Sequence, residues 1–260
     1  MAVPYIGVTG VLDSAFANVL AQAFPWDERR RLMAGVCCSK KMLREGRNRH
    51  PYLFPDLQQI PRILSGDPRV LNIIHYFAED DLALENELAW LMSLCQSVPL
   101  HGFQLNIPWP RPEALQWVHR QCGRRQIILA LDSVALAQEG NDPSRVVSRL
   151  QNYGDLIDYV LLDPSRGEGK ELDPAWALPF LDAIAADRLG STLGLVVAGG
   201  LGPNTVAPFV RIWERYPNVS CDAQGKLQDP ENKLVRVDWA CDYIYQALIA
   251  CGIQPGRITG

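Results

Sequence analysis

The stretch IDYVLLDPSRGEGKELDPAWALPFLDAIAAD, residues 157–187, contains one complete unit of the predicted fold. Its apolar start, 157–162, is rich in β-branched and aromatic residues and predicts a buried strand. Asp173 and Pro174 introduce an apolar segment, 174–186, that predicts a helix, because aspartate caps free N–H groups and proline suits the first helical position. A glycine-rich, charged loop with one lysine joins the two predicted elements.

The same strand–loop–helix pattern recurs along the whole chain. Further strands are predicted at 4–8, 32–37, 70–76, 102–107, 126–131, 193–198 and 218–221. Further helices are predicted at 14–23, 80–95, 112–121, 143–152, 203–215 and 234–250. About eight such units, with strands that are continuous apolar runs, predict a (β/α)8 TIM barrel of parallel strands. Residues 1–260 are expected to form this one domain, and a doubly wound open sheet is the alternative.

One unit departs from the pattern. Residues 39–56 carry charge, glycine and proline without a clear helical period. They predict an elongated loop between the second strand and its helix.

Composition limits the possible partners. The chain has 260 residues, 48% of them hydrophobic and 21% charged, with a formal net charge of -4. Without a dense basic run, nucleic-acid binding is not expected, because it needs a broad cationic face. No signal peptide and no membrane-spanning apolar run stand out, so a soluble, cytoplasmic protein is expected. The sequence leaves the oligomeric state open.

No cofactor or metal is expected either. The seven cysteines include no CxxC pair, and the four histidines are not spaced as ligand pairs. The segment GEGK lacks the spacing of a nucleoside-triphosphate loop, and no GxGxxG dinucleotide motif follows the first strand. The cysteines are expected mostly to pack as small buried side chains.

Catalytic groups of such barrels lie where strands end, so reactive side chains at the predicted strand ends are the candidate catalytic residues. Asp163 directly follows the sixth strand, and its carboxylate is expected at the open end of the barrel. Gly167 and Gly169 would let the following loop fold over a ligand, and Lys170 could meet an anion. The competing interpretation is that Asp163 caps local N–H groups of an ordinary turn.

The loops after the last two strands are candidates for a phosphate site. Gly199 and Gly200 follow the seventh strand, and Pro203 is predicted to open the next helix. Glycine lets backbone N–H groups approach a ligand, and the N-terminus of a helix favours an anion. Asp222, Gly225 and Lys226, after the eighth strand, could complete the site. The alternative is a tight turn in which the glycines serve geometry alone.

These motifs resemble those of phosphoribosylanthranilate isomerase, the tryptophan-pathway barrel family. YVLLD and GEGKELD match its LLD strand end and glycine-rich loop, and AGGLGPNTV resembles its A-G-G-L-x-P-x-N-V turn. Fainter matches are Gly7-Val8-Thr9, Gln104-Leu105-Asn106 and Asp222-Ala223-Gln224-Gly225. The resemblance is clear over roughly residues 100 to 235.

The resemblance implies a site for a phosphorylated sugar-type molecule and an Amadori-type aldose–ketose isomerisation. It implies that Asp163 is the general acid and that Gln104 contributes to the substrate site. A cysteine just before the first-strand glycine is the family's general base, but Ile6 stands there in this chain. The family's fourth-strand histidine is likewise replaced, by Asn106.

Another residue would therefore have to act as the base. Cys37 or Cys38 could do so from the second strand, because nearby Lys40 and Lys41 would lower a thiol pKa. Packing is the alternative role for both thiols. His75, at the end of the third strand, is a further candidate base. If no base is present, the chain is a divergent binder of phosphorylated ligands without catalysis, or a barrel with a different reaction.

Overall fold

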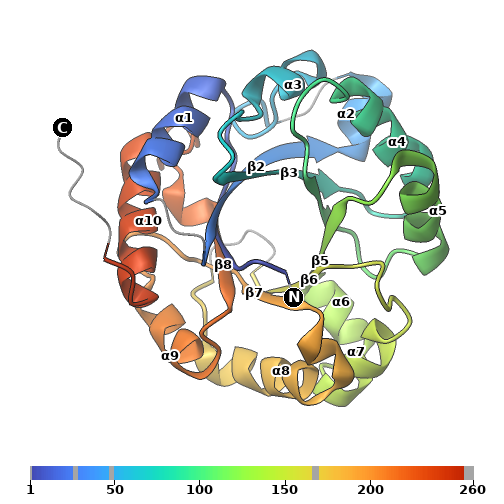
Figure 1. Cartoon of the computed structure of the whole chain (residues 1–260), viewed down its shortest axis with the longest axis vertical. Coiled ribbons are helices and arrows are strands. Elements are labelled where there is room, and N and C mark those ends of the chain that lie inside the picture. Colours follow the sequence, from blue (N-terminus) through green and yellow to red (C-terminus); the bar gives the residue numbers. More distant parts are fainter. Residues whose placement is uncertain (1, 26–28, 47–49, 166–169, 255–260) are drawn as a thin grey trace.

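A closed barrel of parallel strands forms the centre of the computed structural model of the chain (Figure 1). The structure describes residues 2–25, 29–46, 50–165 and 170–254. The strand order is β1 through β8, with β8 hydrogen-bonded to β1, so the predicted (β/α)8 TIM barrel is confirmed. The strands are β1 (Tyr5–Thr9), β2 (Arg31–Ser39), β3 (Val70–Phe77), β4 (Gly102–Asn106), β5 (Gln126–Asp132), β6 (Tyr159–Asp163), β7 (Gly194–Val197) and β8 (Ser220–Ala223).

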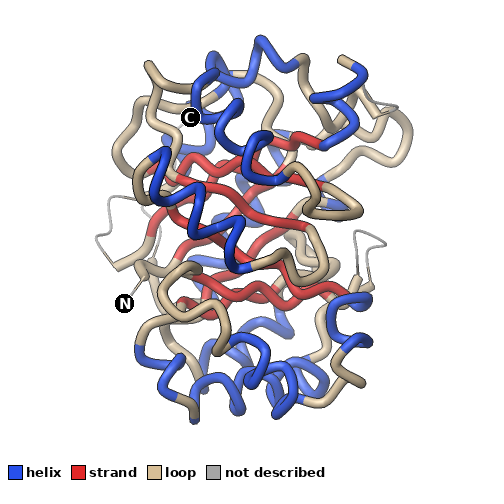
Figure 2. The backbone as a smooth tube through the Cα atoms, turned by 90° about the vertical axis from the view of Figure 1, so that its right-hand side faces the viewer, coloured by secondary structure: helices blue, strands red, loops and turns tan. Residues whose placement is uncertain are grey.

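Helices surround the barrel and cover the outer face of its strands (Figures 1 and 2). The α-helices are α1 (Ser14–Ala23), α2 (Lys40–Glu45), α3 (Ile60–Ile63), α4 (Leu84–Leu94), α5 (Pro112–Cys122), α6 (Ser133–Gln138), α7 (Pro143–Leu150), α8 (Pro174–Ala186), α9 (Ala207–Arg215) and α10 (Val237–Ala250). Short 3-10 turns are η1 (Leu57–Gln59), η2 (Arg188–Ser191) and η3 (Gly225–Leu227). The helices in the described part of the chain are too short or too polar to cross a bilayer.

Capping side chains explain where several helices begin. Asp13 accepts a hydrogen bond from the Phe16 N–H at the start of α1, and Asp142 and Asp173 cap α7 and α8 in the same way. Each aspartate satisfies an N–H group that has no partner within its helix. The predicted bounds of α1 and α8 are confirmed for this reason.

Several predictions about the helices are wrong, since α6 was not predicted and the helices predicted at 80–95 and 234–250 begin only at Leu84 and Val237. The segment after β2 was predicted as a loop without a helix, yet α2 begins at Lys40, where the Ser39 hydroxyl accepts a hydrogen bond from the Met42 N–H. The helix predicted to open at Pro203 begins only at Ala207, because residues 203–205 form a turn. Short capped segments lack the periodicity on which helix prediction depends.

Two apolar layers stabilise the barrel. Between strands and helices lies a continuous layer that includes Ile6, Val8 and Phe103. Inside the barrel a smaller cluster contains Tyr5, Met33, Leu71, Ile73, Ile128, Ala130, Tyr159, Leu161, Val196 and Ala198. Side chains alternate between these layers along each strand, so the residues beyond the inner cluster point into the open end of the barrel.

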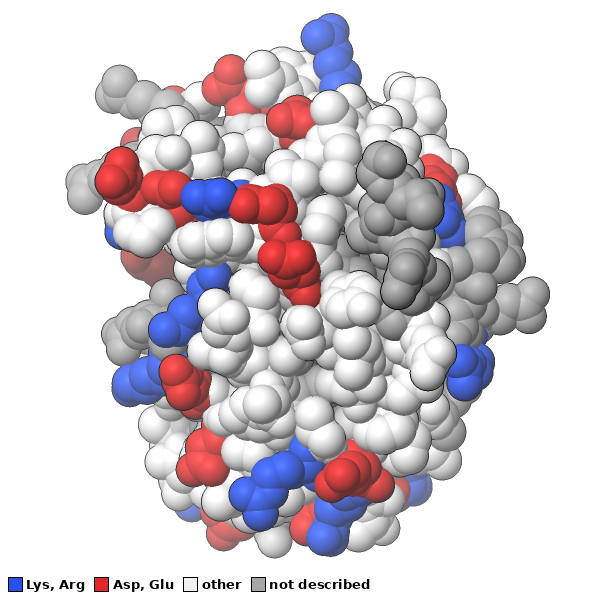
Figure 3. All heavy atoms as spheres, turned by 90° about the vertical axis from the view of Figure 1, so that its left-hand side faces the viewer, with Lys and Arg blue, Asp and Glu red and all other residues white. Residues whose placement is uncertain are grey.

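The outer surface carries both signs of charge. On the face formed by α1, α9 and α10, basic and acidic side chains are interspersed around a central area without charge (Figure 3). Helix α1, SAFANVLAQA, has no charged residue.

Candidate functional site

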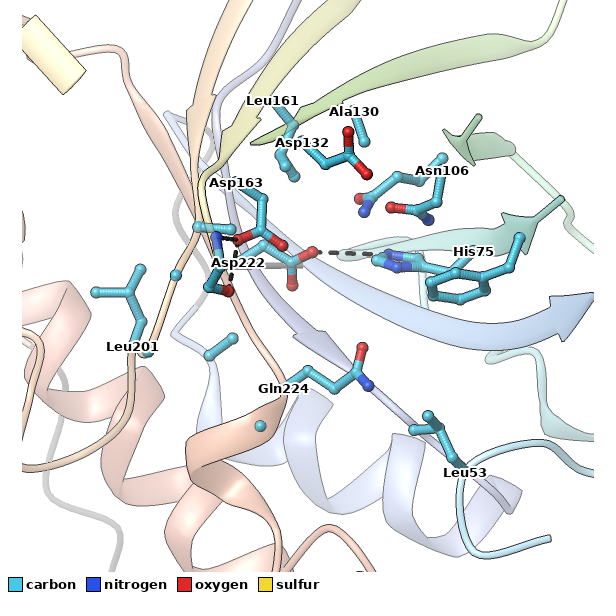
Figure 4. Close-up of a pocket in the computed structure, with 18 of the residues that line it drawn as sticks. Leu53, His75, Asn106, Ala130, Asp132, Leu161, Asp163, Leu201, Asp222 and Gln224 are labelled. Carbon is cyan, nitrogen blue, oxygen red and sulfur yellow. Dashed lines mark hydrogen bonds and ion pairs between the residues drawn. The ribbon is translucent and has the colours of Figure 1, made fainter. Parts of the chain in front are cut away.

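A cavity of about 400 Å³ opens at the carboxyl ends of the strands. Polar side chains from several strands point into it (Figure 4). The lining residues that carry carboxyl, imidazole or amide groups are His50, His75, Gln104, Asn106, Asp132, Asp163, Asp222, Gln224 and Gln228. No lysine or arginine lines it within the described ranges. The cavity is therefore acidic on its strand side, where three aspartates converge.

Asp163, the last residue of β6, lies in this cavity as predicted. Its carboxylate accepts hydrogen bonds from the Ser165 N–H at 2.9 Å and from the Ser165 hydroxyl at 2.7 Å. The side chain therefore braces the following turn, as the competing interpretation predicted, and it also lies beside Asp222 in the cavity (Figure 4), while its catalytic role stays a prediction. Donors to a carboxylate favour its charged form.

Asp222, from β8, belongs to a buried hydrogen-bonded group with Thr9 of β1 and His75 of β3. The Thr9 hydroxyl lies 3.1 Å from Asp222 Oδ1 and 3.0 Å from His75 Nε2. His75 Nε2 lies 3.7 Å from Asp222 Oδ2. Strand β8 pairs with β1 to close the barrel, which brings Thr9 beside Asp222.

Burial shifts the pKa of both titratable members toward the neutral form. It raises the pKa of Asp222 to about 7, assisted by the negative charge of Asp163, while the hydrogen bond from Thr9 lowers it. Burial also lowers the pKa of His75 to about 3. The 3.7 Å contact is therefore between a neutral imidazole and a carboxyl group that titrates near neutrality.

Strands β4 and β5 add polar groups beside this pair. Gln104 and Asn106 of β4 line the cavity, and neither Gln104 Oε1 nor Asn106 Nδ2, both buried, has a hydrogen-bond partner. Asp132 ends β5 and caps α6 through the N–H groups of Val134 and Ala135. Buried polar atoms without partners are costly, so the two amides suit a ligand that supplies the missing hydrogen bonds.

The turn after β7 requires glycine for its own geometry, apart from any contact with a ligand. Gly199 and Gly200 have φ angles of +114° and +54°. A Cβ on Gly200 would lie 2.7 Å from the Lys170 carbonyl oxygen, so the loop before α8 packs directly on this turn. The Thr205 hydroxyl donates to the Gly200 carbonyl at 2.6 Å and closes the turn.

Replacing Gly200 with alanine is expected to lower the free energy of unfolding by about 2 kcal/mol, because the left-handed conformation and the close carbonyl both oppose a Cβ. Gly66→Ala is the matched control, since a Cβ there would meet nothing within 4 Å. Chemical denaturation of both variants measures the difference. Equal stability of the two variants would contradict the tight packing of this turn.

Only some of the residues predicted to bind phosphate line the cavity. Gly199, Gly200, Gly225 and Asp222 line the cavity, but the Lys226 and Lys170 side chains are exposed and are not among the lining residues. The loops after β7 and β8 do touch, because a Cβ on Gly202 would lie 2.8 Å from Lys226 Cβ. Gly167 and Gly169 lie outside the described residues.

The candidate thiols face different layers. Cys37 is fully buried beside His75 in the strand register, and Cys38 packs in the outer apolar layer. Burial raises the pKa of Cys37 far above its usual range and that of Cys38 to about 12, which favours the thiol forms. Lys40 pairs with Asp80, and Lys41 lies 3.7 Å from Glu45, so both cations have carboxylate partners. Cys37 as a base stays a prediction.

The structure shows that Ile6 does not mark the position of a missing catalytic base. This side chain packs in the outer layer, against the helices, while Tyr5, Gly7 and Thr9 are the inward positions of β1. Ile6 therefore does not occupy a place at the cavity where a catalytic base would stand. The first strand presents the Thr9 hydroxyl at the open end instead.

An apolar wall of the cavity was not predicted. Leu53 and Phe54, from the long segment after β2, line the cavity together with Tyr52 and Phe77. The rings of Phe54 and Phe77 meet edge-on with centroids 5.7 Å apart. A loop without periodicity gives no sequence signal for which of its side chains reach a site.

No family model and no curated protein matches the sequence. Among solved structures, the chain is similar to a Rubisco-like protein from Rhodopseudomonas palustris, with a TM-score of 0.55 and 11% sequence identity. The similarity covers 95% of this chain and 64% of that chain. At this identity the similarity shows the barrel fold alone. The resemblance to phosphoribosylanthranilate isomerase has no support from these comparisons and stays a proposal.

In the described parts of the chain, no three histidine, cysteine, aspartate or glutamate side chains are grouped as metal ligands. His101 lies at the opposite end of the barrel, where its Nδ1 accepts a hydrogen bond from the Asn72 N–H.

Proposed function

We propose that this chain is an enzyme that transfers protons on a small phosphorylated hydroxy-carbonyl compound, with Asp222 and Asp163 as the reacting pair. The observation that carries the proposal is the buried Asp222 carboxyl, with a pKa of about 7, in a cavity beside a second carboxylate. An effective general acid or base has a pKa near the working pH. Two carboxyl groups in different environments divide the acid and base roles between them.

The environments favour a division of roles that differs from the one implied by the family resemblance. Asp222 is the better proton donor, because burial keeps it protonated up to about pH 7. Asp163 is the better acceptor, because the N–H and hydroxyl of Ser165 stabilise its charged form. The roles remain exchangeable over a reaction cycle, since each proton given up by one group can be restored by the other.

An aldose–ketose isomerisation of the Amadori type fits this pair. Asp222 donates a proton to the sugar ring oxygen as the C1–O bond breaks, and the lone pair of the amino nitrogen on C1 forms a C=N bond. Asp163 then removes the proton from C2, the C=N electron pair returns to nitrogen, and a C1=C2 enol-amine results. Its C2 hydroxyl loses a proton and C1 gains one, which gives the 1-amino ketose. Each proton delivered is matched by one taken up, so no redox partner is needed.

Backbone groups support the phosphate part of the proposal. The N–H groups of Gly199, Gly200 and Gly225 form no hydrogen bond with another described residue. The two loops that carry them touch, and N–H groups converging from such loops bind phosphate in barrels. With no lysine or arginine among the described lining residues, these N–H groups would carry the anion binding.

Purified protein with phosphoribosylanthranilate is expected to consume the substrate, and Asp163→Asn is expected to lower kcat at least about 100-fold. Asp142→Asn is the control, because Asp142 only caps α7 and asparagine also caps helices. No turnover by the unmodified protein at high enzyme concentration would contradict the isomerase assignment.

Calorimetry with inorganic phosphate separates the remaining possibilities. Phosphate binding without turnover would favour a divergent binder or another reaction. The absence of any binding of phosphate or phosphosugars would contradict both the enzyme and the binder.

A further inference from the structure

The hydrogen-bonded group beneath the cavity is almost completely enclosed. Thr9, His75 and Asp222 are 1%, 2% and 6% exposed. His75 and Asp222 line the cavity, while Thr9 lies between them and is not among the lining residues. The three side chains come from strands that are far apart in the sequence, and Thr9 and Asp222 are separated by 213 positions. The pairing of β1 with β8 brings Thr9 beside Asp222, and Thr9 meets His75 over Gly35 of the intervening strand β2.

Two inward-facing glycines leave the space that this group occupies. A Cβ on Gly35 of β2 would lie 2.7 Å from Thr9 Oγ1 and 2.9 Å from His75 Nε2. A Cβ on Gly7 of β1 would lie 2.8 Å from Asp222 Oδ1. Any larger residue at either position would displace the polar atoms. The absence of a side chain at Gly7 and Gly35 therefore leaves the space that Thr9, His75 and Asp222 fill.

We propose that Thr9 and His75 are positioning residues that form a one-way chain of hydrogen bonds, His75 Nε2–H to Thr9 Oγ1 and Thr9 O–H to Asp222 Oδ1. The chain leaves Asp222 Oδ2 as the oxygen that carries the exchangeable proton. Its use in catalysis rests on the proposed function, whereas the chain itself can be tested without any substrate.

The direction of the chain follows from counting hydrogens. A hydroxyl has one hydrogen to donate, and an ionised carboxylate has none. When Asp222 is ionised, Thr9 must donate to it, so the Thr9 oxygen is left to accept from His75 Nε2–H. A neutral imidazole carries one N–H, and Nε2 lies nearer to Thr9 Oγ1 than Nδ1 does, at 3.0 Å against 3.4 Å, so the proposed chain places this N–H on Nε2.

Protonation of Asp222 does not reverse this order. Reversal would require the proton on His75 Nε2 to leave and Nδ1 to gain one, inside a site that is almost closed to water. The Oδ1 atom stays the acceptor at 3.1 Å, and Oδ2, at 3.3 Å from Thr9, takes the proton. The acid is thus held in one orientation in both of its protonation states.

Other titratable groups surround Asp222, and none donates a hydrogen bond in place of Thr9. Asp163 is the charged neighbour and raises the pKa of Asp222. The remaining groups, all of which burial keeps neutral, are Tyr5 of β1, Cys37 of β2, Cys221 of β8 and Tyr243 of α10.

The test is an NMR titration of the full-length protein without ligand, from pH 5 to pH 8. It follows the side-chain nitrogens of His75 and the carboxyl carbon of Asp222, assigned with Asp222→Asn. His75 is expected to remain the neutral Nε2–H tautomer while Asp222 titrates. Thr9→Val, which keeps the shape but not the hydroxyl, is expected to raise the Asp222 midpoint by about one pH unit.

Thr9→Ser is expected to restore the original midpoint, and Thr192→Val, which removes a hydroxyl that donates to the Leu189 carbonyl, is expected to leave it unchanged. A purely packing role for Thr9 would give an unchanged midpoint in Thr9→Val and would overturn the proposal. A His75 ring protonated only on Nδ1, or on both nitrogens, would overturn it too. If the expected midpoints and the Nε2–H tautomer are observed but the unmodified protein shows no turnover, the proposed function is contradicted and the chain of hydrogen bonds stands.

Discussion

Replacing Asp222 with asparagine is expected to remove a pH dependence of about 4 kcal/mol from the free energy of unfolding. The folded-state pKa is about 7 and the ordinary value is 3.8, a difference of about 3.2 pH units, each worth about 1.4 kcal/mol. The folded protein holds this proton more tightly than the unfolded chain does. The stabilisation is therefore full below about pH 4 and is lost as the pH rises through 7.

Chemical denaturation of both proteins between pH 4 and pH 8 measures this effect. The difference in unfolding free energy between Asp222→Asn and the unmodified protein should grow in favour of the variant as the pH rises. Asp13→Asn replaces an exposed cap with another capping residue and should run parallel to the unmodified protein. Parallel curves for Asp222→Asn would mean that Asp222 is ionised throughout, and the proposed proton donor would be lost with it.

This prediction connects stability with function. A carboxyl group held neutral in a buried site destabilises the folded protein as soon as it ionises. Such a group is retained where its proton is needed, and strained or poorly solvated residues concentrate at functional sites. If Asp222→Asn is more stable than the unmodified protein at pH 8 yet inactive, Asp222 both destabilises the folded protein when it ionises and acts as the proton donor.

The fold could be predicted from the sequence because its signals are local. Apolar runs such as 126–131 and 157–162 end within two residues of the strands they predict, since parallel strands are buried on both faces. Asp13 and Asp173 mark helix starts because a capping oxygen acts only over three residues. Helix α6 was missed because Asp132 is both the end of β5 and the cap of the helix, with no loop between.

The candidate site could be predicted only in part. Strand-end placement brings Asp163, His75, Gln104 and Asp222 to the cavity, because all parallel strands end on one side of the barrel. Their partners could not be predicted. The contact of Thr9 with Asp222 depends on closure between β1 and β8, and its contact with His75 passes over Gly35 of β2, so no local pattern records either contact.

Loop side chains were the least predictable part. Lys226 follows Gly225, which lines the cavity, yet its own side chain is exposed, as is that of Lys170. Proximity in the sequence does not set side-chain direction where the backbone has no period. Ile6 shows the same limit on a strand, since alternation places it outward and a shift of one residue would have placed it inward.

Gly35→Ala is expected to damage the fold and the site together. The added methyl group would lie within 3 Å of Thr9 Oγ1 and His75 Nε2, which belong to buried side chains. Overpacking and a broken buried hydrogen bond each destabilise a protein by about 1–3 kcal/mol. A loss of about 3 kcal/mol in the free energy of unfolding is expected.

The nitrogen NMR signals of His75 distinguish a displacement of the Thr9–His75 contact from a general loss of stability. If the methyl group pushes Thr9 away from His75, the neutral Nε2–H tautomer of His75 loses its acceptor, and its nitrogen signals should change even where the variant is fully folded. Gly66→Ala, in open space, should change neither stability nor these signals. Gly200→Ala should lower stability without altering the His75 nitrogens, because its clash is with the Lys170 backbone. A Gly35→Ala variant of normal stability with unchanged His75 signals would show that the barrel interior has space to spare, and that the glycine is not what keeps these three side chains in contact.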